Sequence, residues 1–142
     1  MALAYNESVS GILKDITYPL FNHTGITHFA YNRFMHGSRY MTLSVDADLT
    51  AYCLSKELDQ YLLFESLIIP RNSKRTVFWD VQQDNALLEA CRSFNYCHGL
   101  SVYIRHENEI EAWSFATDKD NAEINQFYLN HQSLLDEFIL YF

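Results

Sequence analysis

The residues with the most obvious capacity for chemistry are the six histidines and three cysteines of this 142-residue chain. A zinc site needs closely paired Cys and His ligands, but the only close histidine pair, His23 and His28, has no cysteine pair to complete it. A thiol enzyme needs a base aimed at its cysteine, and Cys97 is merely the sequence neighbour of His98. We therefore expect no metal ion, no cofactor and no catalytic activity.

Phosphate and nucleic-acid chemistry is disfavoured by other features. The four glycines stand far apart and form no phosphate-binding loop. The formal charge of −8 repels a nucleic-acid backbone, so we expect no nucleic-acid contact by this segment. No apolar stretch approaches the ~20 residues that cross a bilayer, and three cysteines without paired spacing are typical of a reduced protein. We expect a cytoplasmic protein that does not enter a membrane.

Aromatic side chains suggest non-covalent binding of a small molecule. They make up 15% of the chain, and large flat rings with a few hydroxyl groups can surround an apolar guest. A ligand pocket is mostly apolar with a few convergent polar groups. The candidates for such groups are Tyr31, Tyr52, Glu65, Trp79 and Ser114. The alternative is that the aromatic residues only fill a core.

The helices that must position these side chains follow from apolar residues at steps of three and four. Pro19 predicts that the first helix is kinked or ends near Tyr18. Either Asp46 or Asp48 can cap the second helix, and Asp84 the fourth. The pattern predicts helices over 8–21, 49–56, 61–69, 84–94 and from 118 onward, with an interruption near Asn130.

The strands come in adjacent pairs that are rich in β-branched and aromatic residues. In the first strand, alternation puts His28, Ala30 and Asn32 on one face and Phe29 and Tyr31 on the other. The pattern predicts hairpins at 26–34 with 39–45 and at 100–106 with 109–117, a turn at 36–37, a loop over 70–75 and an extended piece at 76–79. Because paired strands rather than β-α-β units predominate, we expect one α+β domain over residues 1–142, with an antiparallel sheet sandwiched by helices in a PAS/GAF-like α-β-α arrangement.

Three motifs between residues 78 and 118 have an order that identifies a family. They are Phe78-Trp79, the helical segment Ala90-Cys-Arg-Ser-Phe94, and Gly99 before a strand. In this order and spacing the chain resembles the autoinducer-binding domain of LuxR-type quorum-sensing transcription regulators, over nearly its whole length. The resemblance implies an acyl-homoserine lactone held between the sheet and the middle helices, with Trp79 as the family's pocket tryptophan.

The resemblance also implies positions for the other ligand contacts. Tyr52 stands where the family has an upstream tryptophan, Glu65 where it has an aspartate, Lys56 where it has a pocket tyrosine, and Ser114 supplies a hydroxyl near the acyl amide. Glutamate is a methylene longer than aspartate, and a lysine beside the ligand tail needs a counter-charge. We therefore expect a different ligand, more polar or anionic, rather than an ordinary acyl-homoserine lactone.

The sequence predicts no helix-turn-helix domain of the kind that follows the ligand domain in this family. We expect a sensory fragment or a solitary sensor that forms a homodimer, or a heterodimer that silences a full-length regulator. The competing interpretation is a protein–protein module with a filled core. A cavity of roughly several hundred Å³ beside Trp79 would favour the sensor, and a solid core the module.

Overall fold

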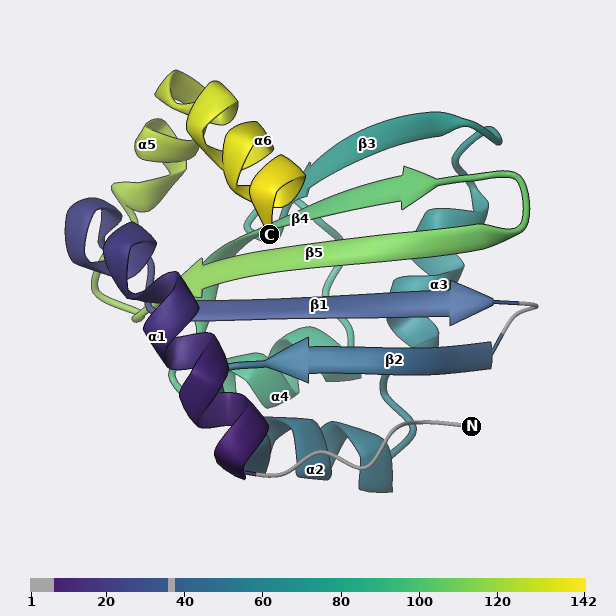
Figure 1. Ribbon diagram of the computed structural model, residues 1–142, viewed down its shortest axis with the longest axis horizontal. Coiled ribbons are helices and arrows are strands. Elements are labelled where there is room, and N and C mark those ends of the chain that lie inside the picture. Colours follow the sequence, from purple (N-terminus) through teal and green to yellow (C-terminus); the bar gives the residue numbers. More distant parts are fainter. Residues whose placement is uncertain (1–6, 36–37) are drawn as a thin grey trace.

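The computed structural model describes residues 7–35 and 38–142 (Figure 1). Its centre is one antiparallel sheet with the strand order β2-β1-β5-β4-β3. The strands are β1 (His28–Met35), β2 (Ser38–Ser44), β3 (Ser73–Phe78), β4 (Cys97–Arg105) and β5 (Glu109–Thr117). The expected turn at residues 36–37 lies outside the described part of the chain.

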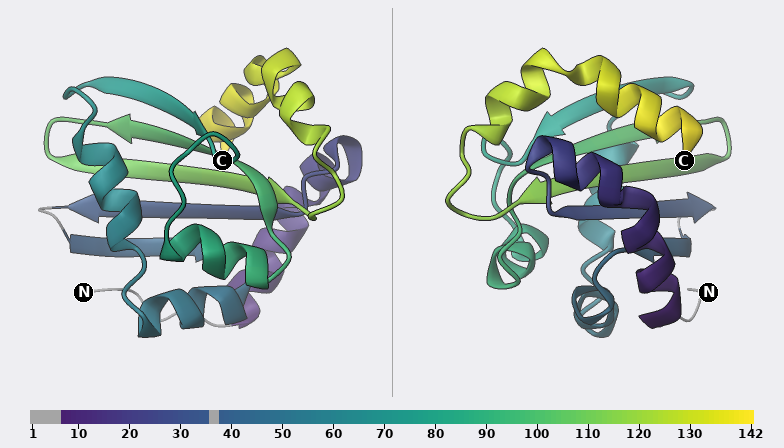
Figure 2. Two further views of the ribbon diagram at one scale, coloured as in Figure 1. Left: turned by 180° about the vertical axis from the view of Figure 1, so that it is seen from behind. Right: turned by 60° about the vertical axis from the view of Figure 1, so that its left-hand side comes forward.

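Helices cover both faces of this sheet, as the two further views make clear (Figure 2). One face carries α1 (Glu7–Thr24), α5 (Ile124–Asn130) and α6 (Gln132–Tyr141). The other carries α2 (Ala47–Ser55), α3 (Gln60–Leu67) and α4 (Ala86–Ser93). The α+β sandwich expected from the sequence is confirmed. Among the described helices, none is both long enough and apolar enough to span a bilayer.

The face under α1 and α6 is closed by a continuous aromatic core. Phe29 of β1 packs against Phe115 of β5, with ring centroids 5.5 Å apart, and against Phe138 of α6 at 5.2 Å. The register of β1 and β5 sets Tyr31 opposite Trp113, and their ring centroids lie 4.4 Å apart. This side of the sheet is filled by its own side chains.

Several expected boundaries differ from the structure by a few residues, and two of these differences have an identifiable physical cause. Of the two alternatives at Pro19, a kink or an end near Tyr18, the early end is wrong, because helix α1 continues to Thr24. Leu20, beyond the proline, is buried in the core, and this packing outweighs the hydrogen bond that proline cannot donate. Strand β3 begins at Ser73, inside the expected loop, because residues 73–75 pair with β4. Sheet pairing overrides the local preference of this polar segment.

Helix caps show why the middle helices begin where they do. Asp46, one of the two proposed caps, accepts a hydrogen bond from the backbone N of Leu49 at 3.0 Å. The cap of α4 is Asn85 rather than the expected Asp84, since Asn85 Oδ1 accepts from the N of Leu88 at 2.9 Å. The predicted interruption near Asn130 is confirmed by the break between α5 and α6.

Candidate ligand-binding site

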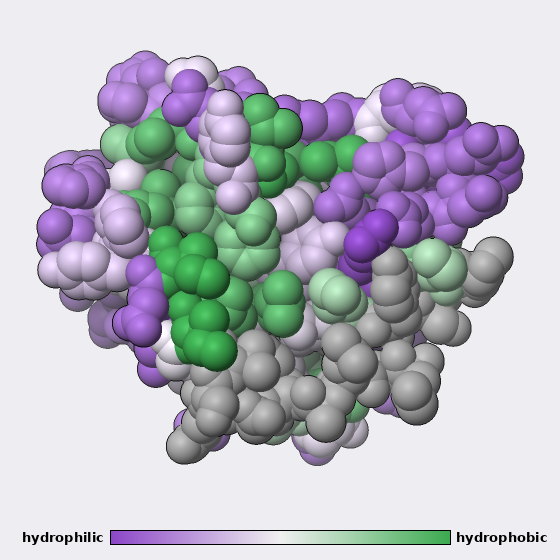
Figure 3. Space-filling model, in the orientation of Figure 1, coloured by the Kyte–Doolittle hydropathy of each residue, from purple (hydrophilic) through white to green (hydrophobic). Residues whose placement is uncertain are grey.

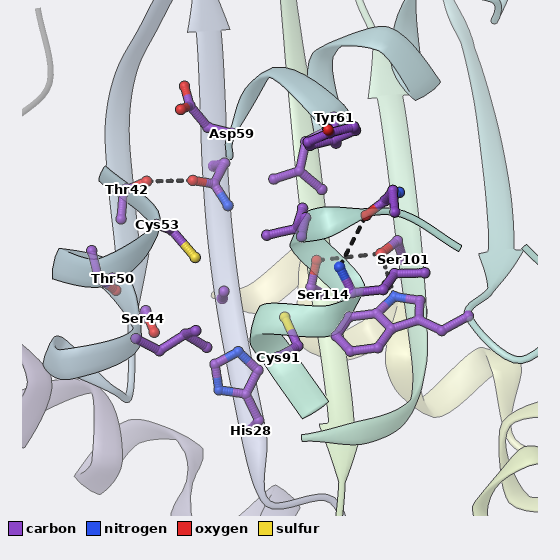
Figure 4. A pocket seen from close by; sticks show the side chains of 18 of the residues that line it. His28, Thr42, Ser44, Thr50, Cys53, Asp59, Tyr61, Cys91, Ser101 and Ser114 are labelled. Carbon is purple, nitrogen blue, oxygen red and sulfur yellow. Dashed lines mark hydrogen bonds between the residues drawn. The ribbon is translucent and has the colours of Figure 1, made fainter. Parts of the chain in front are cut away.

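A pocket lies between the sheet and the layer formed by α2, α3 and α4 (Figure 4). Its volume is about 70 Å³, smaller than the several hundred Å³ that would favour a sensor over a module with a filled core. Trp79, Tyr61 and Tyr103 are the tryptophan and tyrosine residues that line it. The core on this side is therefore neither solid nor widely open.

Trp79 is fixed on the pocket wall by backbone and side-chain contacts. Its backbone N donates to Gly99 O at 2.8 Å, which extends the ladder between β3 and β4 by one residue. Its indole lies directly over Gly99, since a Cβ at that position would stand 2.1 Å from the ring carbon Cδ2. The indole Nε1 donates to Ser101 Oγ at 2.8 Å.

The hydrogen bond of Trp79 continues into a pair of serines. Ser101 and Ser114 are direct partners in the β4–β5 register, so both hydroxyls face the pocket, with their oxygens 3.3 Å apart (Figure 4). Ser101 Oγ already accepts the indole proton, so its own proton can go to Ser114. In that orientation Ser114 donates its hydroxyl proton into the pocket, where it suits a carbonyl oxygen.

His28 forms one end of the same wall. Its side chain is 2% exposed and stacks on Tyr96, with ring centroids 4.1 Å apart. Burial lowers the pKa of His28 from 6.5 to about 4, against the opposing attraction of the Asp46 carboxylate. The imidazole is consequently neutral at neutral pH. Its Nδ1 is buried and has no hydrogen-bond partner among the described residues.

Of the six residues that the sequence analysis proposed as ligand contacts, Trp79 and Ser114 line the pocket. Tyr31 lies on the opposite face of the sheet, because side chains alternate along β1 and Ala30 takes the pocket side. Its ring packs on Trp113 and its hydroxyl donates to Glu111 at 3.0 Å. As a pocket residue Tyr31 was misplaced by the sequence argument.

The other three proposed contacts also lie outside the pocket wall. Tyr52 is exposed on α2 with its ring against Phe94, because Leu49 and Cys53 occupy the inner face of that helix. Lys56 is exposed at the C-terminal end of α2. Glu65 is half-buried on α3, but the helix turns other side chains toward the pocket. The carboxylate on the wall belongs instead to Asp59.

Several lining residues were missed by the sequence argument. Alternation along β1 already placed His28 and Asn32 on one face, and this was the signal that could have found them. The contacts from loops and from the turns before helices carry no comparable pattern. The missed residues with polar side chains are His28, Asn32, Thr42, Ser44, Thr50, Asp59, Tyr61, Gln82, Asn85, Ser101 and Tyr103.

Comparison with known proteins adds a match of fold. No protein-family model and no curated protein sequence matches the chain. Among solved structures, the crystal structure of Escherichia coli SdiA matches with a TM-score of 0.52 and 14% sequence identity, over 97% of this chain. The chain spans 60% of the length of that SdiA chain. The likeness shows a shared fold, in agreement with the fold implied by the resemblance to LuxR-type ligand domains.

Proposed function

We propose that this chain is a small-molecule-binding sensor domain of a LuxR-type transcription regulator, with a ligand preference of its own. The observation that carries the proposal is the hydrogen-bonded series Trp79, Ser101 and Ser114, which ends at the pocket between the sheet and the middle helices. The fold is shared with SdiA, a LuxR-type autoinducer-binding regulator. The pocket can hold a small molecule, and the hydrogen-bonded series directs the hydroxyl of Ser114 toward that molecule.

Ligand binding would act on this domain through stability and association. A ligand that binds only the folded form stabilises it by about 2.7 kcal/mol at a hundredfold excess over its dissociation constant. In a regulator, this stabilisation increases the population of the folded domain that can dimerise. Any DNA contact of such a regulator would have to come from outside this segment, whose formal charge of −8 repels a phosphate backbone.

Thiol protection tests the proposal even though the ligand has not been identified. Cys53 and Cys91 both line the pocket and are buried, and burial raises the pKa of Cys91 to about 12. A thiol reagent therefore labels Cys91 only when the pocket opens. We expect a bound ligand, from a panel of short-chain acyl-homoserine lactones and small neutral metabolites, to slow this labelling at least severalfold. Cys97, which is half-buried away from the pocket, is the internal control.

A flat labelling rate across the panel would contradict the proposal, provided that no compound raises the thermal unfolding temperature either. A compound that slows labelling of Cys97 as much as that of Cys91 acts on global stability and not on the pocket. Mass spectrometry of the labelled peptides separates the two sites.

Two tryptophan variants test where the ligand binds. Trp79→Phe keeps a ring on Gly99 but removes the Nε1 donor to Ser101, so we expect about tenfold weaker binding of any ligand found in the panel. Trp113→Phe makes the same change on the opposite sheet face, where Nε1 has no partner among the described residues. Its effect on affinity is expected to be within about twofold. Equal effects of the two variants, measured by calorimetry, would argue against a ligand beside Trp79.

The alternative function, a dimerisation or protein–protein module, is favoured by one surface. Figure 3 shows apolar side chains gathered on the face that carries α1 and α6. Ile12 and Ile16 of α1 are 61% and 50% exposed. Such a patch on a surface helix is typical of an interaction site. A chain that sediments as a strict monomer and captures no LuxR-type regulator would remove this alternative.

A further inference from the structure

His28 has an unusual position for a buried histidine. It lies on β1 two residues before Ala30, which pairs with Ser114, and His28 itself pairs with Ala116. Figure 4 shows the His28 ring on the side of β1 that faces α4. The neutral ring carries one donor and one acceptor nitrogen. Since Nδ1 is buried without a partner among the described residues, the ring still has an unmet hydrogen-bonding capacity at the pocket wall.

The orientation of this ring is fixed by its surroundings. Tyr96 stacks on one face at an interplanar angle of 23°, and the Tyr96 hydroxyl donates to Asp46 Oδ2 at 2.6 Å. Asp46 in turn caps α2 through the N of Leu49. A ring held in this way cannot swing to solvent to find a partner, so leaving it unpaired costs free energy in the empty pocket.

Gln82 is a second residue that lines the pocket and carries a polar atom without a hydrogen-bond partner among the described residues. It follows Trp79 in the chain, its backbone N donates to Phe78 O and Trp79 O, and its side-chain Oε1 is buried without a partner among the described residues. Of the five buried side-chain polar atoms that have no partner among the described residues, the two on His28 and Gln82 belong to residues that line the pocket. Both residues line the pocket, so one guest can satisfy both.

The charge of the wall limits what that guest can be. Among the described lining residues there is no lysine or arginine, and Asp59 is the one carboxylate. A carboxylate or phosphate group would be desolvated there without a counter-charge. The prediction of an anionic ligand depended on Lys56 as a pocket residue, and the structure does not support it because Lys56 is exposed outside the pocket.

We infer that the pocket takes a small, neutral molecule with hydrogen-bonding groups at both ends, one facing Ser114 and the other facing His28 and Gln82. Hydroxyl and primary amide groups fit this description. The inference rests on the proposed sensor function and specifies its ligand class. A purely apolar tail would leave the His28 ring and Gln82 Oε1 unpaired, and such a site discriminates strongly against a guest that lacks the polar group.

Three small probes of nearly equal size test this ligand class. Tetramethylene glycol has a hydroxyl at each end, n-pentanol has a methyl group in place of one hydroxyl, and γ-hydroxybutyrate has a carboxylate there. Dissociation constants come from nuclear magnetic resonance titrations, with the ¹⁵N shift of His28 Nδ1 as a local signal. We expect the glycol to move this signal, n-pentanol to leave it nearly unchanged, and γ-hydroxybutyrate not to bind.

Variants separate the His28 contact from general hydrophobicity. In His28→Leu, the preference for the glycol over n-pentanol is expected to fall about tenfold. His23→Leu, an exposed histidine at the end of α1, is the matched control and should leave the preference unchanged. Gln82→Leu should also reduce the preference for the glycol over n-pentanol. Gln83→Leu, a change at the exposed neighbouring residue, should not. Both pocket variants remove an unpaired polar group, so they are expected to fold with unchanged or higher stability.

An unchanged preference in both His28→Leu and Gln82→Leu would overturn the inference, as would failure of the glycol and n-pentanol to bind the unmodified protein. These failures are distinguishable from failure of the sensor function. Protection of Cys91 by any compound of the panel would leave the sensor proposal standing while the two-ended ligand class falls.

Discussion

Replacing Gly99 with alanine is expected to lower the free energy of unfolding by about 3 kcal/mol or more, which is the upper range for overpacking a rigid interior. The new Cβ would stand 2.1–2.3 Å from three ring carbons of Trp79. The indole cannot move away freely, because its Nε1 is bonded to Ser101 and its backbone N to Gly99 itself. Urea unfolding followed by circular dichroism measures the change.

Gly11→Ala is the matched control for this variant. Among the described residues, no heavy atom other than those of its chain neighbours and of the helix's own backbone lies within 4 Å of a Cβ at Gly11, and the residue sits inside α1. Alanine is favoured over glycine in a helix by up to about 1 kcal/mol, so this variant should be more stable than the parent. If Gly99→Ala were as stable as Gly11→Ala, the indole would not lie directly over Gly99.

Acidification is expected to destabilise the domain through His28 by about 3 kcal/mol. The pKa of His28 is about 4 in the folded state against 6.5 for a free histidine, and each unit of difference corresponds to about 1.4 kcal/mol. The unfolded chain thus binds the proton first as pH falls. The stability is fully present above pH 6.5 and is lost progressively as pH drops from 6.5 to about 4.

The acid dependence is checked by unfolding at a series of pH values. His28→Leu should remove the contribution of His28 to the pH dependence of the free energy of unfolding. The variant should therefore become more stable relative to the parent as pH falls from 6.5 to about 4. Parallel slopes for the parent and His28→Leu would show that His28 is not a buried neutral imidazole.

Local sequence patterns predicted those features that depend on neighbours along the chain. The period of two in β1 separated His28 and Ala30 from Phe29, and the structure places them on opposite faces of the sheet. Apolar spacing found the break between α5 and α6 near Asn130. The pairing of strands into hairpins predicted the antiparallel sheet. These patterns are fixed by the geometry of a single element, so the sequence contains them.

The candidate site depended on packing between elements, which no local pattern records. Apolar spacing located α2 and α3 but did not settle which side of each helix faces the sheet, so Tyr52 and Glu65 were placed on a wall that Cys53 and Asp59 form. The same packing left His28 Nδ1 without a partner among the described residues and set the pocket at about 70 Å³. The sequence by itself determined the layers of the fold, because strand pairing and helical spacing are local patterns. Only the tertiary structure decided which polar atoms face the pocket, because this depends on the orientation in which three helices pack against one face of the sheet.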